Sequence, residues 1–292
     1  MADRRVLVTG GAGFVGRQVV AALHALGAEP ILPGNPRPDL LATEARRALV
    51  AEAGADTLIH AAWVTRHGAY WDAAENLDWI AASLDLIRAF AASGGKRIVL
   101  VGTCAEYDWS RPTRNPWRET RATRPASLYG AAKLGTWTVA ASFAAQAGLT
   151  AASARLFMPV GRHEAGGRLL PSLIAAAHTG TELRTGPAHL TRDPIDVRDA
   201  GEAIARLTLS EAQGPVNIGT GRPVTLGELV QRVAGAASHR VRLGGRPPRA
   251  GEPLWMVADS ARLRRATGFM PRHTLDDTIA DALAYWRAKT SC

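Results

Sequence analysis

Residues 5–16 read RVLVTGGAGFVG, and this stretch decides the fold class that we expect for the chain. Its first five residues form a β-branched, apolar run typical of a buried strand, and the residues after it show helical spacing. Gly10, Gly13 and Gly16 stand three residues apart between the two patterns. Glycines there let the backbone turn tightly and approach a pyrophosphate at the N-terminus of the helix. The stretch predicts dinucleotide binding, the alternative being a glycine turn that serves packing alone. The residues expected to contact the cofactor here are Gly10, Gly13, Phe14 and Val15.

Strand and helix patterns alternate along the first half of the chain. Further strands are expected at residues 30–33, 56–62, 97–102 and 149–157, with helical segments between them. This alternation predicts an α/β fold with a doubly wound (Rossmann) parallel sheet. The shorter elements after Met158 predict a smaller C-terminal α/β domain that binds substrate. The expected domains are a dinucleotide-binding domain over residues 1–160, completed by residues 194–214, and a mostly substrate-binding domain over residues 161–292.

Composition narrows the class of protein. The 292 residues are 47% hydrophobic and 21% charged, as in an ordinary globular protein. Cys104 and Cys292 are the only cysteines, so we expect no disulfide framework and no metal site. The N-terminus carries no signal pattern and no 18-residue apolar run follows, so we expect a cytoplasmic protein without a membrane partner. The net charge of +9 is spread along the chain, which favours an anionic small substrate over nucleic acid.

The end of the second strand bears on the choice of cofactor. An acidic residue at this point of a Rossmann fold binds a free ribose 2′-hydroxyl, whereas an arginine accepts a 2′-phosphate. Here Gly34 replaces the acid and Arg37 follows, which favours NADP(H) over NAD(H), the alternative being that Arg37 is a solvated loop charge. Further cofactor contacts are expected from Asn35, Arg37, Asp39, Leu40, Ala61, Ala62 and Lys133.

Tyr129 and Lys133 are candidates for proton transfer. Four residues apart, they share one face of a helix. A lysine beside a phenol favours phenolate and lowers the pKa of the tyrosine, although such a pair also occurs on ordinary helix surfaces. Thr103 follows a strand at the sheet edge where ligands bind in parallel α/β folds. His60, inside an apolar strand, is interpreted as an interior histidine and not as a base.

With the glycine turn, Thr103 and the Tyr129-x-x-x-Lys133 pair in this order, the chain resembles the extended short-chain dehydrogenase/reductases that act on nucleotide sugars. The resemblance runs nearly end to end and includes residues 192–197, 216–221 and 249–252. It implies that Tyr129 is the acid/base, that Lys133 binds the nicotinamide ribose and that Thr103 bonds the reacting oxygen. It also implies a nucleotide-diphosphate sugar substrate and a homodimer. The expected substrate-binding residues are Trp63, Thr103, Cys104, His163, Arg192 and Arg249, with the two arginines on the diphosphate.

The family contains several activities, and the residues after Thr103 distinguish among them. Similar dehydratases have Asp-Glu where this chain has Cys104-Ala105, so water elimination lacks its acid and base. Many epimerases and dehydratases have asparagine at the position of Met158. We therefore expect an NADPH-dependent reductase of a nucleotide-linked 4-keto-6-deoxyhexose. The alternatives are a nucleotide-sugar epimerase of the same family, for which Cys104 and His163 are proton-transfer candidates, and an NADP-sensing regulatory protein without turnover.

Overall fold

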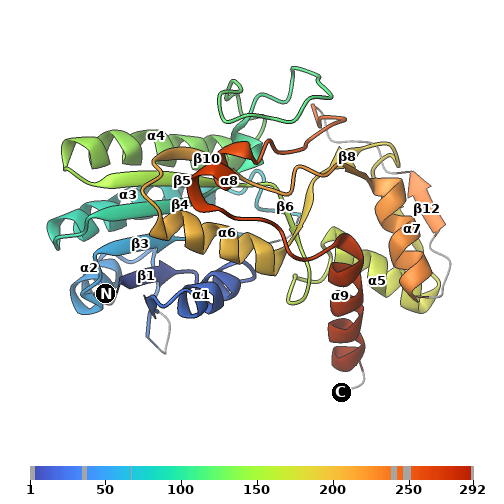
Figure 1. Ribbon diagram of the computed structural model, residues 1–292, viewed down its shortest axis with the longest axis horizontal. Helices are drawn as coiled ribbons and strands as arrows, with labels where there is room; N and C mark the ends of the chain where they lie inside the picture. Colours follow the sequence, from blue (N-terminus) through green and yellow to red (C-terminus); the bar gives the residue numbers. More distant parts are fainter. Residues whose placement is uncertain (1–3, 35–37, 67, 238–241, 246–250, 291–292) are drawn as a thin grey trace.

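A parallel sheet forms the centre of the molecule (Figure 1). The computed structural model describes residues 4–34, 38–66, 68–237, 242–245 and 251–290. In this part of the chain the sheet has six strands in the order β2-β1-β3-β4-β5-β10, all parallel. The doubly wound α/β fold expected from the sequence is confirmed. The strands are β1 (Arg5–Thr9), β2 (Glu29–Ile31), β3 (Thr57–His60), β4 (Arg97–Thr103), β5 (Thr150–Leu156) and β10 (Gly214–Ile218).

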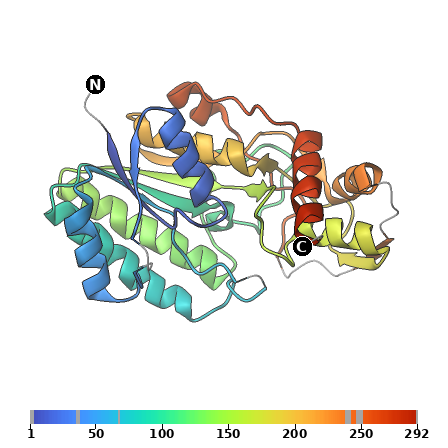
Figure 2. The ribbon, with the colours of Figure 1, turned by 90° about the horizontal axis from the view of Figure 1, so that it is seen from below.

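Helices cover both faces of this sheet, as Figure 2 shows. One layer contains α1 (Gly16–Ala25), α6 (Val197–Leu209) and α8 (Ala261–Thr267). The other contains α2 (Thr43–Ala53), α3 (Glu75–Ala92) and α4 (Leu128–Gln146). Each layer packs apolar side chains against its own face of the sheet, which explains why the strands are apolar on both faces.

The connection from β1 to α1 depends on its glycines. Gly10 has a φ of 73°, and a Cβ there would lie 2.6 Å from the backbone nitrogen of Ala62 in the chain after β3. A Cβ on Gly16 would collide with the carbonyl oxygen of Gly10. The Gly13 N–H donates to that same carbonyl at 2.9 Å, which closes the turn. Only glycines allow the turn and the next strand to approach so closely.

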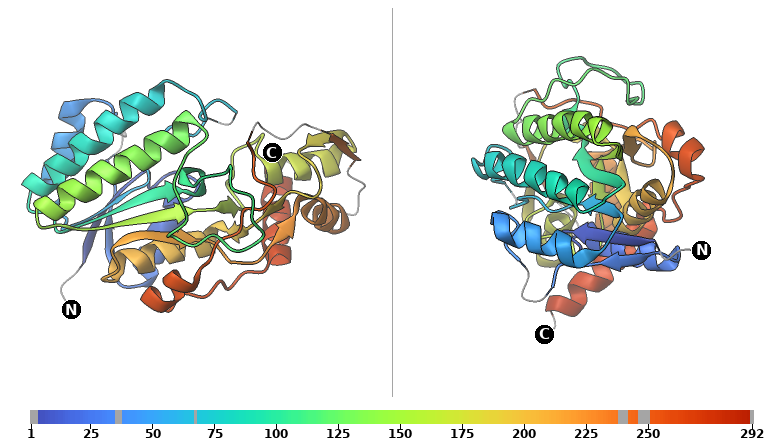
Figure 3. Two further views of the ribbon diagram at one scale, coloured as in Figure 1. Left: turned by 90° about the horizontal axis from the view of Figure 1, so that it is seen from above. Right: turned by 90° about the vertical axis from the view of Figure 1, so that its left-hand side faces the viewer.

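A smaller C-terminal region lies beside one end of the sheet (Figure 3). Its core lies between α5 (Leu169–Thr179), α7 (Leu226–Ala237) and α9 (Leu275–Thr290). Short strands pair here: β6 (Met158–Val160) with β9 (Pro194–Asp196), β8 (Thr191–Arg192) with β11 (Val224–Thr225), and β7 (Glu182–Thr185) with β12 (Arg242–Gly245). The chain crosses back to the sheet for α6 and β10 before it returns to this region. None of the described helices is both long and apolar enough to cross a membrane.

Candidate active site

A cleft of about 1140 Å³ lies at the carboxyl edge of the sheet. The turn of residues 10–16 lines it, as do residues that follow β2, β3, β4 and β5. Residues of the C-terminal region, including His163, Arg168 and Arg192, complete the wall. This crevice beside the point where the strand order reverses is where parallel α/β folds bind ligands.

The glycine turn fits the pyrophosphate of a dinucleotide. Gly13 is exposed, and a Cβ there would be 3.1 Å from the carbonyl oxygen of Gly10. The start of α1 therefore borders the cleft, where its backbone N–H groups can bind a phosphate. Phe14, Val15, Ala61 and Ala62 line the same cleft, as the sequence suggests.

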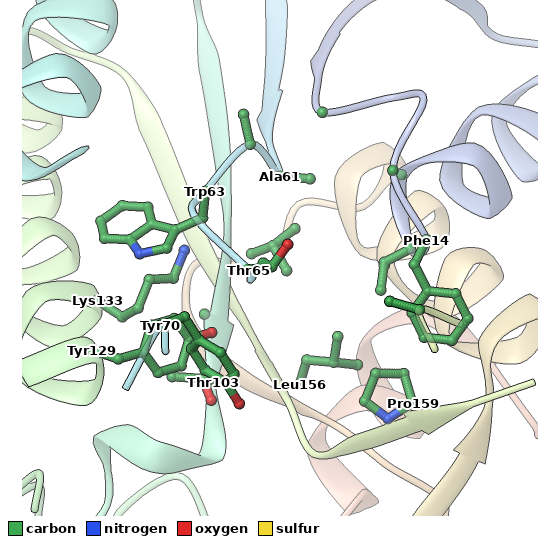
Figure 4. A pocket seen from close by; sticks show the side chains of 18 of the residues that line it. Phe14, Ala61, Trp63, Thr65, Tyr70, Thr103, Tyr129, Lys133, Leu156 and Pro159 are labelled. Atoms are coloured by element: carbon green, nitrogen blue, oxygen red, sulfur yellow. The ribbon is translucent and has the colours of Figure 1, made fainter. Parts of the chain in front are cut away.

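Thr103, Tyr129 and Lys133 come together in one wall of the cleft (Figure 4). Thr103 ends β4, and the other two residues lie in the first turns of α4. The Ser127 side chain caps this helix by accepting the Gly130 N–H at 3.1 Å. The Tyr129 N–H, free of helical partners in the first turn, donates to the carbonyl oxygen of Trp71 at 2.9 Å. These bonds fix the position of Tyr129 relative to the cleft.

The pKa of Tyr129 differs from the expectation that Lys133 lowers it. Burial raises the pKa of Tyr129 well above its usual value, and a hydrogen bond with Thr103 opposes this only in part. The Lys133 Nζ lies 4.1 Å from the centre of the Trp63 ring, beside which Figure 4 shows it. Burial lowers the pKa of Lys133 to about 8, against the opposing effect of Glu106. In this arrangement Tyr129 keeps its proton at neutral pH, because desolvation is the largest influence on its pKa.

Thr103 is held by a buried ion pair that sequence reasoning missed. Glu106 is fully buried, and its Oε1 accepts the Thr103 N–H at 2.8 Å. Its Oε2 accepts from the Nε of Arg155 at 2.7 Å. The Thr103 Oγ1 accepts the Ala105 N–H at 3.2 Å, which leaves the hydroxyl hydrogen to be donated elsewhere. No spacing rule reveals this pair, because Arg155 comes from the neighbouring strand β5.

Aromatic side chains form the part of the wall next to Tyr129. The ring of Tyr70 meets that of Tyr129 edge-on, with centroids 4.9 Å apart. The ring of Trp71 lies 5.8 Å from Tyr129 and 6.0 Å from Trp109. Nothing in the sequence singled out these contacts.

The other expected substrate residues line the cleft in different settings. Cys104 is buried, its Sγ lies 3.9 Å from the carbonyl oxygen of Phe157, and burial raises the pKa of its thiol to about 12. His163 has a φ of 66° and its Nδ1 lies 3.1 Å from the Tyr285 hydroxyl. Arg192 is buried and donates to Glu252 at 2.6 Å, so it is already ion-paired within the wall.

Two residues expected to contact the cofactor, Asp39 and Leu40, are not among those that line the cleft. Leu40 is buried in the core of the α2–α4 layer, and Asp39 accepts the Leu41 N–H at 2.9 Å.

His60 is an interior histidine, bonded to Thr9 at 2.7 Å and to Ser83 at 2.8 Å, and burial lowers its pKa to about 3. Asn35, Arg37 and Arg249 lie outside the described residues.

Comparison with known proteins identifies the family. The model of the NAD dependent epimerase/dehydratase family matches residues 6–219, well over half of the chain. The chain belongs to this family. That membership confirms an NAD(P)-dependent enzyme of the extended short-chain dehydrogenase/reductase kind.

Individual relatives carry several activities. A UDP-glucose 4-epimerase of Corynebacterium glutamicum is 27% identical over 97% of this chain and 96% of its own. A GDP-6-deoxy-D-mannose reductase of Pseudomonas aeruginosa is also 27% identical, over 98% of both chains.

Solved structures agree with the fold. The NAD complex of the Thermus thermophilus UDP-glucose 4-epimerase superimposes with a TM-score of 0.87 at 24% identity, covering 97% of this chain and 99% of the other. The NADPH complex of RMD from P. aeruginosa gives 0.87 at 25% identity, covering 98% and 99%. Both nicotinamide cofactors thus occur among similar proteins.

Proposed function

We propose that this enzyme carries out hydride chemistry at C4 of a nucleotide-linked hexose, with 4-epimerisation as the overall reaction. The observation that carries the proposal is the meeting of Thr103, Tyr129 and Lys133 in the wall of a cleft that begins at the glycine turn. UDP-glucose and UDP-arabinose 4-epimerases are frequent among the similar proteins. The sequence alone placed net reduction first, and the relatives support the epimerase alternative better.

The side chains have roles that follow from their positions. When bound, the nicotinamide cofactor supplies an acceptor for the C4 hydride and later returns it. Oxidation of the 4-hydroxyl requires the ionised form of Tyr129, which would take the hydroxyl proton; the phenol so formed would give that proton back when the C4 ketone is reduced from the other face. The Thr103 hydroxyl donates to the same oxygen while negative charge develops there. Lys133, one turn along α4 from Tyr129, would contribute positive charge that favours this ionised form, against the burial that raises the pKa of Tyr129.

Proton removal from a sugar carbon is less well supported. The Cys104 thiol is buried with a pKa of about 12, so it is protonated at neutral pH. Desolvation and neighbouring positive charges lower the pKa of His163, which is held against Tyr285. Because the Cys104 thiol is protonated and buried, we favour hydride transfer at C4 over proton movement by Cys104 and His163.

A reductase of a nucleotide-linked 4-keto sugar is the second candidate. The raised pKa of Tyr129 suits a proton donor, which is the role that ketone reduction needs. Gly34, in the cleft wall after β2, supplies no carboxylate for the free ribose hydroxyl of NAD, which favours NADPH. Net reduction consumes a cofactor, whereas epimerisation does not.

One incubation separates the two candidates. UDP-glucose, and then GDP- and dTDP-hexoses, are incubated with the purified enzyme with and without added NAD(P)H, and the products are separated chromatographically. We expect interconversion of the 4-epimers without net cofactor consumption, abolished by Tyr129→Phe. Oxidation of NADPH by a 4-keto sugar nucleotide without interconversion would establish the reductase instead. Absence of both reactions with every nucleotide sugar would overturn both.

A further inference from the structure

A carboxyl group in the cleft wall is buried and incompletely bonded. Glu164 belongs to the segment between β6 and α5, lines the cleft and is 5% exposed. Among the described residues, its Oε2 atom has no hydrogen-bond partner. A buried polar atom without a partner costs stability, so each one in a folded protein calls for an explanation.

The other buried carboxylates near the cleft are explained by their partners. Glu106 binds Arg155 and the Thr103 N–H, and Asp193 accepts three backbone N–H groups and the Thr220 hydroxyl. Glu164 has no such set. Burial raises its pKa to about 8, and the charge of Arg168 and the backbone of Gly161 oppose this only in part.

One neighbour of Glu164, Arg168, lies near the aromatic wall. Arg168, four residues later, lines the same cleft, and its Cζ lies 5.7 Å from the centre of the Tyr70 ring. Tyr70 in turn meets Tyr129 edge-on at 4.9 Å. Figure 4 shows Tyr70 and Tyr129 together at one end of the cleft and Phe14 of the glycine turn at the other.

We propose that Glu164 and Arg168 bind adjacent hydroxyl groups of the sugar ring of the substrate. The carboxyl oxygen accepts a hydrogen bond from one hydroxyl, and the guanidinium group donates to its neighbour. A sugar hydroxyl both donates and accepts, so two adjacent hydroxyls satisfy both side chains at once. This inference rests on the proposed function, because it takes a nucleotide sugar as the ligand.

Other roles for the Glu164 carboxyl group predict different results. A contact to the cofactor would change its affinity, and a contact to the nucleotide would change the affinity for a nucleoside diphosphate. A purely structural role would make the carboxyl group stabilising. Glu164→Gln keeps the shape and removes the acid, while Glu164→Met removes every polar atom of the group.

The binding test uses calorimetry on the purified protein with UDP-glucose, GDP-mannose and dTDP-glucose, each compared with its own sugar-free diphosphate. For whichever sugar nucleotide binds, we expect Glu164→Met to weaken binding roughly 10- to 100-fold, the range for leaving a buried sugar hydroxyl without its partner. The affinities for the matching diphosphate and for NADH and NADPH should stay within about twofold. Glu164→Gln should weaken sugar binding less than Glu164→Met, since its amide still accepts a hydrogen bond.

The stability test uses a matched control. Glu202 is also buried, at 8% exposure, but is paired with Arg206 and Arg272. We expect Glu164→Met to raise the melting temperature of the ligand-free protein by about 2–4 °C, because an unsatisfied group is removed. Glu202→Met should lower it, because two arginines lose their partner.

Each outcome is decisive. Failure of the wild type to bind any of the three sugar nucleotides would refute the proposed function and this inference with it. Normal binding with an unchanged affinity in Glu164→Met would refute the inference alone. So would an equal loss for the sugar-free diphosphate, a loss of cofactor affinity, or a lower melting temperature in Glu164→Met.

Discussion

The buried ion pair behind Thr103 provides a sharp prediction. Glu106 and Arg155 are 0% and 3% exposed, and the Nε–Oε2 distance between them is 2.7 Å. Glu106→Gln leaves the guanidinium charge buried without its counter-charge, and Arg155→Met does the reverse. Breaking one partner of such a pair costs about 3–5 kcal/mol of the free energy of unfolding. That is a large part of the 5–15 kcal/mol typical of a folded domain.

Urea denaturation of the two single variants and the double variant measures the pair directly. We expect the double variant to lose at least about 2 kcal/mol less than the sum of the singles, because neither charge remains alone. Glu228→Gln is the control, since Glu228 pairs with Arg232 on the surface at 2.9 Å and should cost less than about 1 kcal/mol. Additive losses, or a cost of Glu106→Gln no larger than that of Glu228→Gln, would refute the reasoning.

Three further predictions concern the cleft. Thr103→Val should lower kcat about 10²- to 10³-fold while Thr103→Ser retains most activity, as measured by initial rates, because valine cannot donate to the reacting oxygen. The pKa of Lys133 is lowered from 10.5 to about 8 in the folded protein. The free-energy cost of burying its positive charge therefore destabilises the fold fully below pH 8 and disappears toward pH 10.5. Between pH 8 and 10 the free energy of unfolding of the wild type should therefore rise relative to that of Lys133→Met, and parallel pH profiles would contradict this. Gly10→Ala places a Cβ 2.6 Å from the Ala62 nitrogen at a φ of 73°, so calorimetry should show weakened cofactor binding and unfolding should occur at lower temperature.

The sequence was most informative where local patterns carry the structure. The glycine turn requires the geometry found at Gly10 and Gly16, and the apolar runs predicted every strand of the sheet up to β5 within a few residues. The spacing of Tyr129 and Lys133 placed both on α4, and the end of β4 placed Thr103 opposite them. Each of these features depends on a few neighbouring residues.

Features that depend on distant segments escaped prediction. Arg155 meets Glu106 only because β4 and β5 pair in the register that sets Gly102 beside Arg155. Lys133 meets Trp63, and Tyr129 meets Tyr70, through a loop whose course no periodicity specifies. The raised pKa of Tyr129 follows from burial by these partners, which sequence spacing does not reveal. The choice of cofactor and the homodimer remain predictions.

Hydride transfer at C4 is the central claim, and isotopic labelling tests it most directly. The nucleotide sugar that turns over is prepared with deuterium at C4 and converted by the enzyme in ordinary water, and the product is analysed by mass spectrometry. We predict that the deuterium stays at C4 of the epimer, because the same hydride is taken and returned while Tyr129 moves only the hydroxyl proton. Replacement of the deuterium by solvent hydrogen would contradict the account, since it would show that C4 loses a proton and not a hydride.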